Sequence, residues 1–276
     1  MKTRAFPPIL LAALTAACAG GPPSPPSLSY GMPGLEDVSY GYADTTVVSI
    51  SLMGQGVELT QEGVAEYAVS FSPDPEGVGV TLTVPSLSAS INQPMGEAVR
   101  LDEGDVTGQL VFSLDRRGEA TLTESPEVSD QASQMVSGLG LANGFFPRLP
   151  GRAVAVGESW TDTISYEGLQ GPRRASETTV LTYTALGDTV LDGRALLAIS
   201  LEGTTRSSNE MDVSGMAVSQ SSELDVTGTV LWDLQRGLMF ESVRSATGNG
   251  TVRIPIAPQP LPISIRTTQR ARIQQD

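Results

Sequence analysis

Carboxylates are the side chains of this chain that could carry catalytic or metal chemistry. They gather in three short clusters: Asp102, Glu103 and Asp105; Glu210 and Asp212; Glu223 and Asp225. Hydrolysis of a glycosidic bond needs two carboxylates across a cleft, and a calcium site needs several oxygen ligands in one loop. Acidic residues that are close only in sequence lie more often in solvated turns. We therefore expect no catalytic residue and no metal site in these clusters.

The composition excludes most other catalytic chemistry. The chain has no histidine, which removes Ser-His-Asp triads, Cys-His pairs and ordinary zinc sites. Lys2 is the only lysine, so a chain without its first residues lacks Schiff-base chemistry and the lysine of a phosphate-binding loop. No Gly-x-Ser-x-Gly motif is present. The sequence thus predicts a protein that is not an enzyme and that needs no cofactor.

The first 18 residues have the pattern of a secretory signal. Lys2 and Arg4 precede an apolar run, Ile9–Leu14, which is too short to span a bilayer. Small residues then lead to Cys18 in the order Thr-Ala-Ala-Cys. This order resembles a bacterial lipobox, which implies removal of residues 1–17 as a signal peptide and acylation of Cys18. The alternative is an ordinary secretory signal in which the cysteine occurs by chance.

The segment after Cys18 is rich in Pro, Gly and Ser and cannot bury a core. Cys18 is the only cysteine, so no disulfide is expected. We interpret residues 18–40 as a lipidated tether to a membrane. No aspartate follows the cysteine, and by resemblance to lipoprotein sorting in proteobacteria this implies the outer membrane of the cell envelope. The domain would face the periplasm or the cell surface.

The charge of the chain makes nucleic acid an improbable partner. Removal of Lys2 and Arg4 leaves 15 basic residues of the original 17 against 31 acidic residues, a net charge of −16. Such an acidic chain is repelled by nucleic acid and by anionic lipid headgroups. We interpret the charge as a source of solubility.

Most of the remaining chain has the period-2 pattern of antiparallel strands. The last segment is the clearest: Ile263, Ile265 and Ile273 share one parity, and Arg266 and Arg270 share the other. Such strands have one apolar face and one wet face. A single helix is predicted near the middle of the chain, over residues 126–139, with Ser129 or Asp130 as its N-cap. The fold class is therefore mainly β.

One stretch of sequence occurs twice. Residues 105–116 and 225–236 align without gaps with six identities in twelve positions, and Phe112 matches Trp232. Two unrelated hairpins could converge on such residues, because hairpins need similar chemistry. We favour two similar halves, residues 41–125 and 155–273, which a helix and loop at 126–154 join. Both halves would belong to one β-rich domain, residues 41–273.

The junction between the halves reads FFPRLP at 145–150 and VGESW at 156–160. Together with the lipobox, the long meander and the central helix, this junction resembles uncharacterised bacterial lipoproteins related to the lipoprotein-carrier (LolA/LolB-like) superfamily. The resemblance implies a curved antiparallel sheet, an unclosed β-barrel, with helical structure on its concave side.

These observations lead to three functional hypotheses. The first is a non-enzymatic envelope lipoprotein that holds a lipid or another apolar ligand on the concave face of the sheet. Phe112, Trp160 and Trp232 are the expected ligand-binding residues if a cavity exists; otherwise they pack in the core. The second is a structural lipoprotein that docks another envelope protein. The third is a carboxylate-dependent glycan hydrolase.

Overall fold

The computed structural model describes residues 25–31, 36–52, 55–75, 77–92, 97–134, 138–170, 173–213, 216–255, 257 and 259–274. The predicted signal peptide and Cys18 lie outside these residues. Twelve strands of the described residues form one antiparallel sheet, as predicted. They are β2 (Val38–Leu52), β3 (Gln55–Asp74), β4 (Gly77–Asn92), β5 (Val99–Asp102), β7 (Leu110–Asp115), β8 (Ala120–Glu124), β11 (Ser159–Gln170), β12 (Arg173–Leu191), β13 (Arg194–Val213), β14 (Met216–Asp233), β15 (Leu238–Arg253) and β16 (Leu261–Ile273).

The first and last long strands meet in the middle of the sheet. The order is β11-β12-β13-β14-β15-β16-β2-β3-β4-β7-β8, and β5 pairs with β4. The sheet therefore begins at β11 and ends at β8, and both of these edge strands come from the middle of the chain. These two edges do not pair with each other in the described residues, so the curved sheet stays open.

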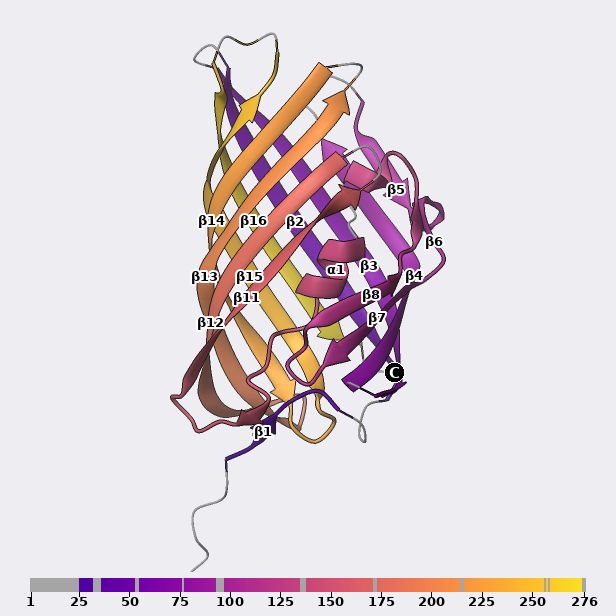
Figure 1. Cartoon of the computed structure of the whole chain (residues 1–276), viewed down its shortest axis with the longest axis vertical. Coiled ribbons are helices and arrows are strands. Elements are labelled where there is room, and N and C mark those ends of the chain that lie inside the picture. The colour runs from indigo at the N-terminus through magenta and orange to yellow at the C-terminus, as the bar shows by residue number, and fades with distance from the viewer. Residues whose placement is uncertain are drawn as a thin grey trace, which may run out of the picture.

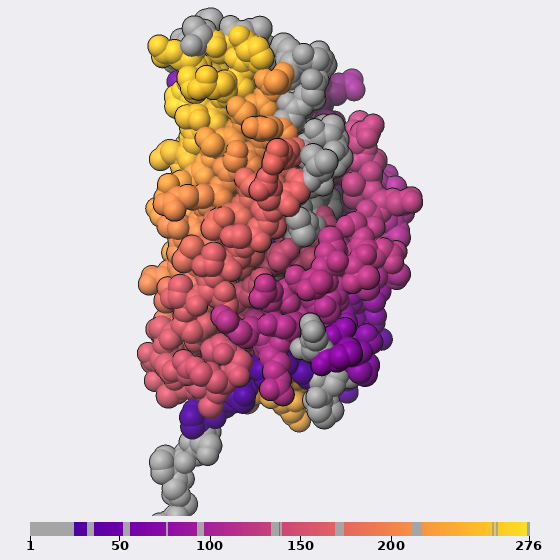
Figure 2. Space-filling model, in the orientation of Figure 1, coloured from indigo at the N-terminus to yellow at the C-terminus, as the bar shows by residue number. Residues whose placement is uncertain are grey.

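A short helix lies across the open side. Helix α1 (Gly138–Gly144) contacts both edge strands, β8 and β11, on the concave side of the sheet (Figure 1). Over the lower front of the molecule, residues of the 100–150 region meet residues of the 155–190 region (Figure 2). The open unclosed sheet with a central helix is the predicted architecture.

The alternation of side chains divides the sheet into two faces. Ile263, Ile265 and Ile273 are buried on the concave face, as predicted from their shared parity. The convex face is wet and holds ion pairs such as Arg206–Glu223, whose Nη2 and Oε1 atoms are 2.7 Å apart. A polar outward face is typical of an antiparallel sheet that contacts water.

An aromatic core fills one end of the curved sheet. The FFPRLP segment contributes Phe145, Phe146 and Leu149, all of which are buried. The two phenylalanine rings stand edge to face at 4.9 Å, and Phe145 also meets the ring of Tyr40 at 5.2 Å. Edge-to-face pairs of this kind stabilise a core beyond their buried area. The FFPRLP segment therefore fills the end of the curved sheet at which the N-terminal residues of the domain lie.

The predicted tether is shorter than expected. Residues 18–40 were assigned to it, but Ser27–Leu28 form strand β1, which pairs with β10 (Arg152–Ala153). Leu28 and Tyr30 are 0 % and 2 % exposed, and the Tyr30 hydroxyl donates to the carbonyl of Pro147 at 2.9 Å. These two side chains, together with backbone hydrogen bonds such as that from the Tyr30 amide to the Arg116 carbonyl at 3.0 Å, dock the segment against the core. The domain also starts slightly earlier than predicted, because β2 begins at Val38.

The predicted helix over residues 126–139 is wrong in its position. Glu127–Val128 form strand β9, which pairs with β6 (Val106–Thr107), and Ala132–Gln134 form a single 3-10 turn. The Ser129 hydroxyl accepts from the Ala132 amide at 3.1 Å, so the predicted cap exists but starts only this turn. The α-helix begins at Gly138, where we expected the helix to end. Met135 and Val136 of the predicted helix lie outside the described residues.

The repeated sequence forms two hairpins of similar construction. β7 and β14 are each the fourth strand of their half in the order of the sheet, and each pairs with the next strand through a β-bulge. The bulges fall at the same aligned step, before Phe112 in one copy and before Trp232 in the other. The copies differ at their start, because Gly108 has a φ of +81° and separates β6 from β7, whereas β14 runs through without a break. The two halves join into one sheet through the β16–β2 pair.

Candidate functional site: a cavity on the concave face

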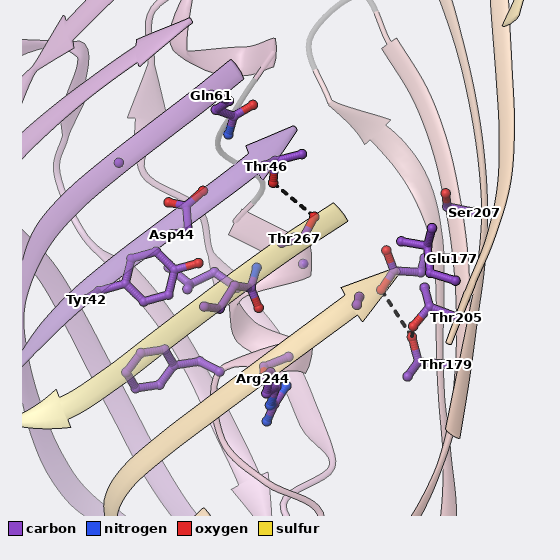
Figure 3. Close-up of a pocket in the computed structure, with 18 of the residues that line it drawn as sticks. Tyr42, Asp44, Thr46, Gln61, Glu177, Thr179, Thr205, Ser207, Arg244 and Thr267 are labelled. Atoms are coloured by element: carbon purple, nitrogen blue, oxygen red, sulfur yellow. Dashed lines mark hydrogen bonds between the residues drawn. The ribbon is translucent and has the colours of Figure 1, made fainter. Parts of the chain in front are cut away.

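A cavity of about 530 Å³ lies on the concave face, above the aromatic core. This volume is within the usual range for small-molecule sites. Strands from both halves and helix α1 contribute to its wall, including Tyr42, Asp44, Thr46, Tyr67, Leu141, Phe145, Glu177, Thr179, Thr205, Ser207, Arg244, Thr267 and Gln269. Figure 3 shows the side chains of β2 on one wall and those of β12 and β13 on the opposite wall.

On three strands of the wall, polar side chains give way to apolar ones towards the aromatic core. On β2 the inward side chains are Thr46, Asp44 and then Tyr42. On β12 they are Glu177, Thr179 and then Leu181.

The same direction holds on β16, where Thr267 and Gln269 lead to the buried Ala271 and Ile273. On the other side of Thr267 the inward side chains of β16 are again apolar, Ile265 and Ile263, so the polar groups form a band within the wall. A cavity that combines a polar band with an aromatic surface suits an amphipathic ligand.

Four threonine hydroxyls of the wall are paired with one another. Thr46 and Thr267 share a hydrogen bond of 3.0 Å across the β2–β16 pair. Thr179 shares one of 2.8 Å with Thr205 and donates to the Glu177 carboxylate at 3.3 Å (Figure 3). These bonds satisfy the groups within the wall, so the hydroxyl rows are parts of a preformed lining.

Asp44 differs from its neighbours because its carboxylate has no partner. It is half-buried and makes no hydrogen bond or ion pair with the residues that the structure describes. Burial raises the pKa of Asp44 to about 6. Its partner in the β2–β3 register is Gly63, and a Cβ atom at Gly63 would lie 2.6 Å from Oδ1 of Asp44. The missing side chain of Gly63 therefore provides the space that the carboxylate occupies.

Aromatic rings lie beside this carboxylate at the apolar end. The ring centroids of Tyr42 and Tyr67 are 5.3 Å apart, and those of Tyr67 and Phe145 are 5.5 Å apart. Burial, together with the charge of Asp44, raises the pKa of both tyrosines far above the ordinary value. Both hydroxyls therefore stay protonated at any physiological pH.

Arg244 is the basic side chain of the cavity wall. Its Nη1 atom donates to the carbonyl of Gly144 at 2.8 Å and so ties β15 to the end of α1. Its Nε atom is shielded from solvent and has no hydrogen-bond partner in the described residues. Because Asp44 and Glu177 also line the wall, two carboxylates face one guanidinium. The charges that line the cavity therefore sum to a negative value at neutral pH.

The aromatic residues that we expected at a cavity wall lie in the core. Phe112 and Trp232 are each 1 % exposed, and Trp232 stands edge to face on Tyr30 at 5.2 Å. Trp160 stacks on Tyr183 at 5.5 Å, and its Nε1 donates to the Arg148 carbonyl at 3.1 Å. None of the three is among the residues that line this cavity. Their packing corresponds to the alternative that we gave for them.

The described acidic side chains of the three clusters lie in a capped turn, in a surface ion pair or exposed to solvent. Asp102 and Asp105 form a capping box around a 3-10 turn, where Oδ1 of Asp102 accepts from the Gly104 amide at 2.9 Å. Glu223 pairs with Arg206 on the convex face. Glu210 and Asp225 are exposed, and the side chain of Asp212 lies outside the described part. Within the described residues, no group of three or more His, Cys, Asp or Glu side chains could hold a metal ion.

Sequence reasoning missed Asp44 and Glu177, although a signal was available. Asp44 shares its parity with Tyr40 and Tyr42, so a carboxylate stands on the buried side of a strand. Glu177 likewise shares its parity with Leu181. A charged residue on the apolar parity of a strand is the pattern that predicts an inward polar site.

Comparisons with known proteins give little more. No protein-family model matches the chain, and no curated protein matches it. Among solved structures, the chain is similar to the β domain of the Bordetella autotransporter BrkA, with 10 % identity, coverage of 86 % of this chain and 99 % of that chain, and a TM-score of 0.24. It is also similar to a BenF-like porin from Pseudomonas fluorescens Pf-5 (7 % identity, 88 % and 100 % coverage, TM-score 0.24) and to Acinetobacter baumannii OccAB1 (10 %, 92 % and 100 %, TM-score 0.23). TM-scores this low carry no argument about function.

Among the described residues, no helix has the length and apolar character needed to cross a membrane.

Proposed function

We propose that this chain is a non-enzymatic lipoprotein of the bacterial cell envelope that holds an amphipathic ligand, such as a lipid, on the concave face of its sheet. The observation that carries this proposal is the cavity of about 530 Å³, whose wall combines hydroxyl and carboxylate groups with aromatic rings. A structural protein that only docks a partner would need no such space in its interior. The cavity therefore favours binding over the docking alternative.

The N-terminal sequence supports the place of the protein in the envelope. The order Thr-Ala-Ala-Cys at residues 15–18 resembles a lipobox, and the first described residues dock at the aromatic end of the sheet. An anchor at Cys18 would hold that end towards an outer membrane. Substitution of Cys18 by Ser should release the protein from the membrane fraction, and retention of this variant would refute the anchor.

The open sheet also supports kinship with the lipoprotein-carrier superfamily. An unclosed antiparallel sheet with a helix on its concave side is the architecture that the sequence resemblance implies. In this protein α1 has seven residues and borders the cavity through Gly140, Leu141 and Gly144. Kinship would place the ligand between the sheet and this helix.

The test of binding is native mass spectrometry on the Cys18→Ser protein after gentle purification from its own envelope. We expect a stoichiometric adduct of lipid size that organic extraction removes. A matched pair of variants locates the ligand: Ala246→Trp adds a ring on the cavity side of β15, and Thr247→Trp adds one on the convex side. Ala246→Trp should remove the adduct and Thr247→Trp should keep it. A bare mass for the unsubstituted cavity, with no uptake of added phospholipid, would contradict the proposal.

A carboxylate-dependent glycan hydrolase is the second candidate, on one observation. Asp44 and Glu177 line the same cavity from strands β2 and β12, and the raised pKa of Asp44 suits a general acid. The test is release of reducing ends from envelope glycans, with Asp44→Asn and Glu177→Gln as the inactive variants. No turnover by the unsubstituted protein would exclude this candidate.

A further inference from the structure

We propose that the ligand carries a positively charged nitrogen on an apolar body, and that Asp44 binds this organic cation against the rings of Tyr42 and Tyr67. The inference rests on the proposed function and names the ligand class of the same cavity. An ammonium-bearing amphiphile has the required chemistry.

The carboxylate of Asp44 has no partner among the described residues. Asp44 points into the cavity (Figure 3), and no described residue donates a hydrogen bond to it or forms an ion pair with it. Removal of a carboxylate from water is costly unless a positive charge or a hydrogen-bond donor compensates. The hydroxyl of Thr46 is paired with that of Thr267, the hydroxyl of Thr179 is paired with that of Thr205, and none of them is paired with Asp44. A bound cation would supply the missing partner.

The Asp44 carboxylate fits a space that the absence of a side chain at Gly63 leaves open. Gly63 stands opposite Asp44 in the register, and even a methyl group there would collide with Oδ1 of Asp44. The sheet thus accommodates the carboxylate at the border of the cavity and does not cover it with a side chain. This arrangement leaves Asp44 accessible from the ligand side.

An aromatic surface lies beside the Asp44 carboxylate. Tyr42 and Tyr67 line the cavity next to Asp44, and Phe145 extends the aromatic surface towards the core. Organic cations bind over the faces of such rings because the ring quadrupole attracts positive charge. A carboxylate with adjacent rings recognises an ammonium group better than a neutral polar group.

The cavity wall carries more negative than positive charge. Asp44 and Glu177 are acidic, and Arg244 is the one basic side chain among the lining residues. Arg244 is engaged with the Gly144 carbonyl of α1, and its Nε atom is shielded. This balance attracts a cationic ligand and repels an anionic headgroup.

The experiment uses the full mature Cys18→Ser protein at pH 8 and three probes of equal chain length below their critical micelle concentrations. They are dodecyltrimethylammonium, dodecyl maltoside and dodecyl sulfate, and isothermal titration calorimetry gives each affinity. We expect the ammonium probe to bind about tenfold or more tightly than the other two. Equal affinities for all three, or a preference for the sulfate, would overturn the inference.

Variants connect this preference to the named residues. Asp44→Asn should weaken the ammonium probe about tenfold and so remove its advantage over the neutral probe, and Tyr42→Leu should weaken the ammonium probe about threefold. Glu62→Gln removes the same charge from the convex face one residue from Gly63, and it should change nothing. Retention of the full ammonium preference in Asp44→Asn would overturn the inference while neutral binding, and the proposed function, stand. Failure of every probe to bind would overturn both.

Discussion

The Asp44 carboxylate occupies the space that a side chain at Gly63 would fill. A Cβ atom at Gly63 would lie 2.6 Å from Oδ1 of Asp44, a separation that forces one of the two groups to move. The carboxylate is the free end of a side chain, so it moves more easily than the strand. This relationship connects the place of one glycine in β3 to the charge of the cavity.

Substitution of Gly63 by Ala should therefore displace Asp44 into the cavity and towards solvent. We expect the pKa of Asp44 to fall from about 6 towards the ordinary value of an aspartate, because its desolvation decreases. The measurement is a carboxyl-carbon NMR titration. Gly56→Ala on the same strand is the control, since a Cβ atom there meets nothing within 4 Å. An unchanged titration in Gly63→Ala would contradict the expectation.

The stability of the protein should fall as pH rises through the range from about 4 to 6. Because burial raises the pKa of Asp44 to about 6, the folded state binds its proton more tightly than the unfolded state does. The stabilisation by this proton is complete below the unfolded pKa and is lost as pH rises through the folded pKa. The pKa difference corresponds to at most about 3 kcal/mol, and solvent screening of a half-buried group reduces it to about 1–2 kcal/mol.

Urea unfolding of the protein and of Asp44→Asn between pH 4 and pH 8 measures this effect. The variant should gain about 1–2 kcal/mol over the unsubstituted protein at pH 8 and nothing at pH 4. Glu62→Gln, on the convex face, should show no such trend. The other titratable or charged groups of the wall are Glu177, Arg244, Tyr42, Tyr67 and Tyr166. If the difference in unfolding free energy between Asp44→Asn and the unsubstituted protein were the same at every pH, the effect would come from these other groups or from packing.

Phe112 should matter for stability and not for binding. Its ring is buried against the aromatic core, 6.3 Å from that of Phe146, and it does not line the cavity. Phe112→Ala should cost about 3–4 kcal/mol of unfolding free energy. The variant, assayed below its melting temperature, should keep the affinity of the unsubstituted protein for the ammonium probe. A loss of affinity without a loss of stability would return Phe112 to the site.

Period-2 patterns predicted the class of fold because burial on one face leaves a direct trace in the sequence. Ile263, Ile265 and Ile273 lie on the concave face as their parity requires. The pairing of β16 with β2 leaves no such trace, because it joins segments from opposite ends of the chain. That long-range pair places the two sheet edges at mid-chain, and so it determines where α1 and the cavity lie.

The cavity was harder to predict for the same reason. Asp44, Glu177 and Arg244 are far apart in sequence, and only the curvature of the sheet brings them to one space. The large aromatic residues were expected at the cavity wall but lie in the core. Trp160 and Trp232 are conspicuous in the sequence, but a ring that can bury its whole surface stabilises the core more than it would at an open wall.

The two repeated hairpins allow a matched test of their turns. Oδ1 of Asp115 accepts from the amides of Arg117 and Glu119, and Oδ1 of Asp233 accepts from those of Gln235 and Arg236. Asp233 is only 4 % exposed and also lies 3.7 Å from Nη1 of Arg194.

Loss of either turn aspartate leaves amides without their acceptor. Asp115→Ala should cost about 1 kcal/mol in its exposed turn, and Asp233→Ala about 2–3 kcal/mol in its buried one. Chemical denaturation of both variants measures the difference. Equal costs would mean that burial of Asp233 adds nothing to its bonds.

The N-terminal segment should contribute to stability from residue 27 onwards. Leu28 and Tyr30 are buried in the aromatic core, and the Tyr30 ring meets Trp232 at 5.2 Å. A protein that begins at residue 25 should therefore unfold at the same urea concentration as one that begins at Cys18→Ser. One that begins at residue 32 should lose about 3–5 kcal/mol, because two large side chains leave the core. Tyr30→Phe is the intermediate case and should lose about 1 kcal/mol with its bond to Pro147. Equal stability of the two truncated proteins would show that the segment is a tether through residue 31, as the sequence alone had indicated.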